Sequence, residues 1–229
     1  MYKVVTVVDE SLKRIIDLLL TIFILILLSP IFLIVAILEK LSSEDVFFKQ
    51  ERIGKNLTPI YVYKFTTMPK GSEKKGSITT ISDKRISRLG RFLRRYKINE
   101  LPQIINVVKG DMSLVGPRPL LQEHANIYEE EARRKIYSVR PGLTGIGSIY
   151  FSKEDILMDK FKSKEEKEHF YKTKIMPEKA RMELWYIQNR NIILDLYILL
   201  LTGLKLLGLN ISGVSLKNIF PCFEKNSGE

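Results

Sequence analysis

The sequence predicts an α+β fold that is mostly helical: a re-entrant membrane helix hairpin, then a compact domain with a small β-hairpin and amphipathic helices at the membrane interface. Three observations lead to this prediction. An uncharged apolar run extends from Leu18 to Leu38, aromatic and β-branched stretches lie between residues 46 and 65, and helical spacing of apolar residues dominates the rest. We expect a membrane segment over 1–41, a domain over 42–210 and a tail over 211–229.

The apolar run is long enough to cross a membrane. As a helix its 21 residues extend about 31 Å, and the hydrocarbon core of a bilayer is about 30 Å thick. Ser29-Pro30 interrupts the run, and a proline inside a helix removes one backbone donor and kinks the helix. A kinked crossing, the commoner arrangement, and a re-entrant helix both remain open. Lys13 and Arg14 before the run and basic segments after it favour re-entry, with both ends in the cytoplasm.

Charge and composition narrow the classes of function. The net charge of +11 suits a surface facing anionic lipid head groups, nucleic acid or phosphorylated substrates. The one cysteine, Cys222, excludes an intramolecular disulfide, and His124 and His169 have no metal-ligand spacing, so we expect no zinc site. The apolar run is longer than the core of a secretory signal peptide, and no small-residue cleavage site follows it.

The segment after the run predicts a hairpin and a basic helix. Residues 46–65 form the hairpin around Gly54, and a polar surface loop follows over 69–82. Residues 83–98 form an amphipathic helix, capped by Ser82 or Asp83, in which seven of the fourteen residues 84–97 are Lys or Arg. Its apolar face consists of Ile86, Leu89, Leu93 and Tyr96. Such a helix either docks on an anionic membrane surface or phosphate-rich ligand, or exposes a solvated face.

The remaining chain predicts further helices joined by turns. We expect a short helix over 100–109 that ends at Gly110, a loop over 111–121, a helix over 121–138, a loop over 140–148, two surface helices over 153–183 broken near Pro177, and an amphipathic helix over 185–209.

Acids and arginines gather in three tight-turn segments, INELPQ, GDMSLVGPRP and VRPGLTG. Glu100 and Asp111 supply hard oxygen ligands of the kind that bind Mg²⁺. Arg118 lies between two prolines and Arg140 precedes one, so each presents a guanidinium from a restricted backbone to a phosphate. Each segment alone also fits a purely structural turn. Together with an apolar anchor, they indicate phosphate chemistry on a lipid-linked substrate.

From about Lys13 to Leu207 the chain resembles the bacterial sugar transferases, which are monotopic phosphoglycosyl transferases. The matching segments are KRIIDLLL, LLSPIFLIVAILEK, FFKQERIGKN, IYVYKFTTM, ELPQIINVVKGDMSLVGPRPLL and VRPGLTG. The resemblance implies transfer of sugar-1-phosphate from a nucleotide sugar, usually a UDP-sugar, to polyprenyl (undecaprenyl) phosphate with release of UMP. It places this first step of glycan assembly at the cytoplasmic face of the bacterial inner membrane, and it implies Mg²⁺ and a re-entrant helix broken at Ser29-Pro30.

The resemblance also implies roles for individual residues. In the family an Asp-Glu pair opens the ELPQ helix: the Asp attacks the β-phosphate and forms a covalent phosphosugar intermediate, while the Glu, here Glu100, binds Mg²⁺. Arg118 and Arg140 are expected to contact phosphates, and Lys64 to line the active-site cleft. Asp111 remains a second candidate metal ligand.

This chain has Asn99 at the position of the attacking aspartate. A neutral carboxamide cannot form the expected acyl phosphate. Three explanations are open: a deliberate change that traps a substrate complex, a natural relative that kept only binding, or attack by Glu100 or Asp111. A second departure follows VRPGLTG, where relatives often have an Asn-Gly-Arg element and this chain reads IGSIYFSKEDI, so we expect altered binding of the nucleotide sugar.

The alternative function is a catalytically silent relative that binds polyprenyl phosphate or a partner transferase. A nucleic-acid binder is disfavoured, because the basic helix lacks interleaved aromatic residues for base stacking. The expected partners are therefore a UDP-sugar, polyprenyl phosphate and anionic membrane lipids, and a homodimer stays open.

Overall fold

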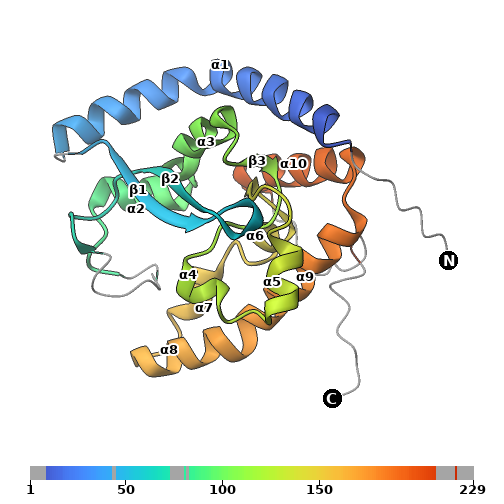
Figure 1. Cartoon of the computed structure of the whole chain (residues 1–229). Coiled ribbons are helices and arrows are strands. Elements are labelled where there is room, and N and C mark those ends of the chain that lie inside the picture. Colours follow the sequence, from blue (N-terminus) through green and yellow to red (C-terminus); the bar gives the residue numbers. More distant parts are fainter. Residues whose placement is uncertain (1–8, 43–44, 73–79, 81–82, 210–219, 221–229) are drawn as a thin grey trace.

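The computed structural model describes residues 9–42, 45–72, 80, 83–209 and 220, and this part is mostly helical with short strands, as predicted (Figure 1). The elements are α1 (Glu10–Ser42), β1 (Phe47–Ile53), η1 (Lys55–Leu57), β2 (Pro59–Phe65), α2 (Arg88–Arg95), η3 (Ile98–Gln103), α3 (Ile104–Lys109), β3 (Ser113–Val115), α4 (Gln122–Ala125), α5 (Glu130–Ile136), β4 (Gly142–Thr144), α6 (Ile146–Tyr150), α7 (Glu154–Met158), α8 (Lys164–Phe170), η4 (Tyr171–Ile175), α9 (Met176–Asn189) and α10 (Ile192–Leu206). The predicted tail apart from Phe220, and most of the loop over 69–82, lie outside the described residues, and so does Cys222.

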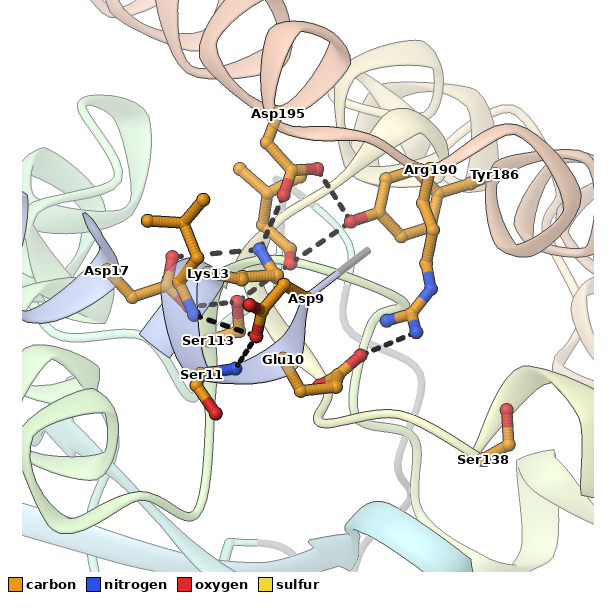
Figure 2. A network of polar contacts seen from close by, with 12 residues as sticks. Asp9, Glu10, Ser11, Lys13, Asp17, Ser113, Ser138, Tyr186, Arg190 and Asp195 are labelled. Carbon is orange, nitrogen blue, oxygen red and sulfur yellow. Dashed lines mark hydrogen bonds and ion pairs between the residues drawn. The ribbon is translucent and has the colours of Figure 1, made fainter. Parts of the chain in front are cut away.

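Helix α1 is one helix of 33 residues that arches over the rest of the domain (Figure 1). Buried polar contacts hold its first turns. Lys13 Nζ lies 2.5 Å from a carboxylate oxygen of Asp195 in α10, and Ser113 of β3 donates a hydrogen bond of 2.6 Å to Asp17 (Figure 2). Because buried charges are tolerated only when they are paired, these contacts define one position for the start of α1.

The other end of α1 packs on the same domain through apolar side chains. Val35 is buried in a cluster with Phe65 of β2 and Leu93 of α2. The ring of Phe32 lies 5.1 Å from that of Phe65 and 5.9 Å from that of Phe47. Both ends of α1 therefore contact one domain.

The outward face of α1 is apolar and exposed. By length and composition this helix can cross a membrane, and only 11% of its most apolar window is buried, unlike the core helix of a soluble protein. The exposed apolar residues include Leu19, Ile22, Phe23, Ile26, Leu27, Leu33, Ile34 and Ile37.

The helix continues through Pro30, so the hairpin predicted at Ser29-Pro30 is not confirmed. Pro30 has no N–H to donate to the carbonyl of Ile26, four residues earlier. The Ser29 hydroxyl donates to that carbonyl instead, over 2.9 Å. Ser29 thereby replaces the missing hydrogen bond locally.

The predicted β-hairpin is confirmed, and a second pair of strands was not predicted. β1 and β2 are antiparallel, with Phe47 opposite Phe65. β3 and β4 are parallel, with Ser113 opposite Gly142 and Val115 opposite Thr144, in segments that we predicted as loops. Strands of three residues are too short to show an alternating pattern in sequence.

The basic helix is shorter than predicted. α2 begins at Arg88, and the hydroxyl of Ser87 caps it, instead of Ser82 or Asp83. Leu93 is buried, whereas Tyr96 is 47% exposed, so Tyr96 does not belong to the buried face.

Four other predicted helices need correction. The helix predicted over 185–209 is divided between the end of α9 and α10. The predicted break near Pro177 is wrong: α8, the π-helical turn η4 and α9 follow one another without interruption, and Pro177 directly follows Met176, the first residue after the π-helical turn. The helix predicted over 121–138 is two short helices, α4 and α5. The helix predicted over 100–109 begins as the 3₁₀ turn η3 and ends, as predicted, at Gly110 with φ +91°.

Candidate active site

Three charged side chains from separate segments meet at Glu100. Glu100 lies in η3, Lys64 lies near the end of β2, and Arg118 follows β3 in the Gly-Pro-Arg-Pro turn. Arg118 Nη2 lies 3.0 Å from Glu100 Oε1, and Lys64 Nζ lies 3.5 Å from the same oxygen. The structure therefore brings together three of the residues that the sequence analysis selected.

These charges shift one another's pKa. Burial alone would raise the pKa of Glu100, but Arg118 and Lys64 outweigh it and hold this pKa well below its ordinary value. Burial lowers the pKa of Lys64 to about 7, with Glu100 opposing and Arg52 reinforcing the shift. Near neutral pH, Glu100 is therefore ionised, and Lys64 is present in both its protonated and its neutral form.

Two arginines that the sequence analysis did not select join this group, Arg52 of β1 and Arg94 of α2. Burial lowers the pKa of both, that of Arg52 to about 10. Arg52 donates to Gln50, and Arg94 donates to Thr67 over 2.8 Å. A local excess of cations around one carboxylate gives this site a positive charge that favours an anionic ligand. Arg94 was visible only as part of a basic run, because the sequence does not reveal which of its arginines points inward.

Asn99 and Glu100 line the same groove. Asn99 is 8% exposed, and its Oδ1 accepts no hydrogen bond from any residue that the structure describes. Across the described ranges, no three His, Cys, Asp or Glu side chains converge on a point. Glu100 and Asn99 supply a carboxylate and an amide oxygen to this groove, and both are ligand types that suit a divalent cation.

Two residues that the sequence analysis did not select, Glu183 and Tyr137, form hydrogen bonds with the backbone of the Arg118 turn. The backbone N–H of Arg118 donates to Glu183 over 3.4 Å, and the hydroxyl of Tyr137 donates to the Arg118 carbonyl over 3.1 Å. Glu183 is 3% exposed, and burial raises its pKa to about 7. Glu183 shares a face of α9 with the buried Met182 and Tyr186. A carboxylate on an apolar helix face is unusual, and this pattern in the sequence could have indicated Glu183 as a candidate site residue.

Two predicted site residues lie elsewhere. Arg140 donates to the carbonyl of Gly110 over 2.9 Å, in the region where α1 begins. Asp111 accepts from Asn106 over 3.3 Å. Neither residue lines the groove that contains Glu100.

The charged site and an apolar wall share one open groove. Ile24, Leu27 and Leu28 of α1 and Leu199 and Leu206 of α10 line its apolar part. Such a groove suits an anionic ligand with a long apolar portion. The fold and the site thus define a class: an anion-binding α+β domain joined to an exposed apolar helix.

Comparison with known families narrows this class. Residues 8–208 match the family described as bacterial sugar transferase, and the chain belongs to this family.

Three relatives illustrate the similarity. The chain is 38% identical over 197 residues to the uncharacterized sugar transferase EpsL of Bacillus subtilis (strain 168), covering 86% of this chain and 87% of that protein. It is 35% identical over 207 residues to the UDP-glucose:undecaprenyl-phosphate glucose-1-phosphate transferase of Escherichia coli (strain K12), covering 86% of this chain and 40% of that protein. It is 39% identical over 142 residues to the UDP-N-acetylgalactosamine-undecaprenyl-phosphate N-acetylgalactosaminephosphotransferase of Aeromonas hydrophila, covering 60% and 34%. The chain thus spans less than half the length of the two relatives whose names state a reaction.

Proposed function

We propose that this protein has the site of a transferase that moves sugar-1-phosphate from a UDP-sugar to polyprenyl phosphate with release of UMP, that both phosphates bind beside Glu100, and that Asn99 keeps the chain as written from turning its substrates over. The observation that carries the proposal is the group of cations Lys64, Arg52 and Arg118 around one carboxylate, in a groove with an apolar wall. The named relatives act on these two substrate classes. The cations suit the phosphates, and the wall between α1 and α10 suits an isoprenoid chain.

Arg118 and Lys64, the residues beside Glu100, would bind phosphate in different ways. Arg118 offers its planar fork to phosphate oxygens, and Lys64 adds a point charge while it is protonated. An incoming phosphate replaces Glu100 as the partner of Arg118 and frees the carboxylate. Glu100 and the Asn99 amide oxygen would then hold Mg²⁺, which supplies charge neutralisation for the diphosphate when bound.

Asn99 favours a second candidate function, in which the chain binds both reactants without turning them over. The amide is neutral and cannot attack phosphorus as a carboxylate does. The decisive assay measures UMP release from UDP-sugars, with undecaprenyl phosphate and Mg²⁺ in detergent, for the chain as written and for Asn99→Asp.

We expect UMP release only from Asn99→Asp, and the added change Arg118→Met should abolish it. Turnover by the chain as written would instead mean that another nucleophile acts. Absence of UMP release and of UDP-sugar binding in both proteins would overturn the transferase proposal.

We also propose that α1 is re-entrant, with both ends on the cytoplasmic face of the bacterial inner membrane. The contacts of Lys13 with Asp195 and of Val35 with Phe65 support this, because a crossing helix would lose one set. Single cysteines placed at each end, in a Cys222→Ser background, should be labelled from the same side. Replacing Pro30 by Leu should favour a straight crossing, and labelling of the unaltered chain from opposite sides would contradict the proposal.

Helix α2 is proposed to contact anionic lipids. Arg88, Arg91 and Arg95 are exposed, and Phe92 and Tyr96 between and beside them are 54% and 47% exposed. Exposed aromatic rings among arginines are typical of an interfacial helix, and they correct the expectation that this helix lacks interleaved aromatic residues. Binding to vesicles should therefore rise with the fraction of phosphatidylglycerol and fall when the three arginines are replaced by Gln.

A further inference from the structure

The segment that departs from the family pattern, IGSIYFSKEDI, lies along the groove. It forms α6 and α7, and Phe151 and Glu154 line the groove together with Arg118. Glu154 begins α7, and its carboxylate lies 2.5 Å from the amine of Lys179 in α9. A distinctive part of this sequence thus contributes a charged pair to the site.

This pair is held in a fixed position. The amine of Lys179 lies 5.3 Å from the ring centre of Phe151 and 5.1 Å from that of Tyr171. The side chain of Lys179 is 8% exposed, whereas that of Glu154 is 24% exposed. Lys179 is therefore the buried anchor, and the carboxylate of Glu154 is the end that a ligand can reach.

The pair lines the same groove as Arg118, the residue proposed to bind phosphate, and interacts with it electrostatically. The charge of Glu154 contributes to raising the pKa of Arg118, and the charge of Arg118 contributes to lowering that of Lys179. A carboxylate in the same groove as Arg118 repels a diphosphate but accepts hydrogen bonds from hydroxyl groups. In the proposed reaction, the neutral group attached to the transferred phosphate is the sugar.

We propose that the Glu154–Lys179 pair is a specificity-determining subsite that binds hydroxyl groups of the donor's sugar. This inference rests on the proposed function, since it assigns the sugar end of the same substrate. A site built to bind a substrate hydroxyl discriminates strongly, because an analogue that lacks the group leaves a polar side chain unpaired. The pair therefore accounts for sugar preference without contacting the nucleotide.

The test compares UDP-sugars with UDP, by calorimetric titration of the full chain in detergent with Mg²⁺. The sugar probes are UDP-glucose, UDP-galactose, UDP-N-acetylglucosamine and UDP-N-acetylgalactosamine. For the unaltered chain, at least one should bind more tightly than UDP. Glu154→Gln should weaken that sugar at least tenfold and UDP less than twofold. Glu178→Gln, an exposed acid one residue from Lys179 and paired to Arg181, is the matched control and should change neither.

The outcomes separate the subsite from the function. Retained UDP binding by Glu154→Gln would show that the groove is folded. Equal weakening of UDP and UDP-sugar would point to ribose or to a structural role and would overturn the subsite alone, as would no change in either. If the unaltered chain binds neither UDP nor any UDP-sugar, the proposed function fails and the subsite fails with it.

Discussion

The amine of Lys64 lies 3.5 Å from the carboxylate of Glu100, yet the pKa of Lys64 is lowered to about 7. Burial causes this shift, and the nearby Arg52 and Arg118 reinforce it against the attraction of Glu100. A pKa in this range makes the charge of the site depend on pH under physiological conditions.

We predict that UDP-glucose binding weakens about tenfold between pH 6 and pH 8, because the protonated fraction of Lys64 falls by about that factor. The diphosphate of UDP-glucose carries the same charge throughout this interval, so the ligand does not contribute to the change. Titration calorimetry at several pH values measures it.

Lys64→Arg is the control for this effect, because a guanidinium stays charged at every pH tested. Its binding should vary little with pH. If the unaltered chain and Lys64→Arg show the same pH dependence, another group is responsible.

The raised pKa of Glu183 predicts that the free energy of unfolding depends on pH. Its pKa is about 7 when folded, against 4.5 for an exposed glutamate, so between these values the folded chain holds a proton that the unfolded chain has lost. The contribution of Glu183 to the free energy of unfolding therefore falls as the pH rises, by about 2 kcal/mol between pH 5.5 and pH 8. Glu183→Gln should lack this contribution. The difference between the two proteins in chemical denaturation isolates it, and parallel stability curves would contradict the assignment.

Much of the fold could be predicted, because long periodic segments leave clear signals. The helix over the apolar run, the β-hairpin over 46–65 and the stop at Gly110 all match the structure. The parallel pair β3 and β4 could not be predicted, since its three-residue strands are defined by contacts between distant segments. Nor could the uninterrupted helix at Pro177, because a proline that a continuous helix accommodates and one that ends a helix look alike in sequence.

The candidate site divides in the same way. Glu100, Arg118 and Lys64 come together as the family resemblance implied. Arg140 does not join them, because its donation to Gly110 directs it toward the start of α1. Glu183 was missed because the sequence places a carboxylate on an apolar helix face but does not show its contact with Arg118, which depends on tertiary packing.

The parallel strands β3 and β4 lie so close together that position 142 requires a glycine. A Cβ at this position would lie 2.1 Å from the backbone nitrogen of Gly116 and 2.4 Å from the carbonyl oxygen of Thr144, so the strands would have to separate. Gly142→Ala should lower the free energy of unfolding by about 3 kcal/mol and weaken UDP-glucose binding through the displaced Arg118 turn.

Gly203→Ala is the matched control for this prediction. Nothing lies within 4 Å of a Cβ at Gly203, which is inside α10, and alanine is the better helix former by about 1 kcal/mol. This variant should therefore unfold at the same or a higher temperature than the unaltered chain. If both variants unfold alike, the close approach of the two strands does not limit stability.

The buried ion pair of Lys13 should determine how strongly the start of α1 is held on the domain. Its amine lies 2.5 Å from Asp195 and 3.7 Å from Asp17, and all three side chains are at most 10% exposed (Figure 2). Lys13→Met leaves two buried carboxylates without a cation, and removing one partner of a buried pair costs about 3–5 kcal/mol. Adding Asp195→Asn to Lys13→Met should recover part of this loss, because one unpaired charge disappears.

Denaturation in detergent, followed by the fluorescence of the one tryptophan, Trp185, measures both effects, with the exposed Lys40→Met as control. If Lys13→Met and Lys40→Met unfold alike, the first turns of α1 are not held by this pair.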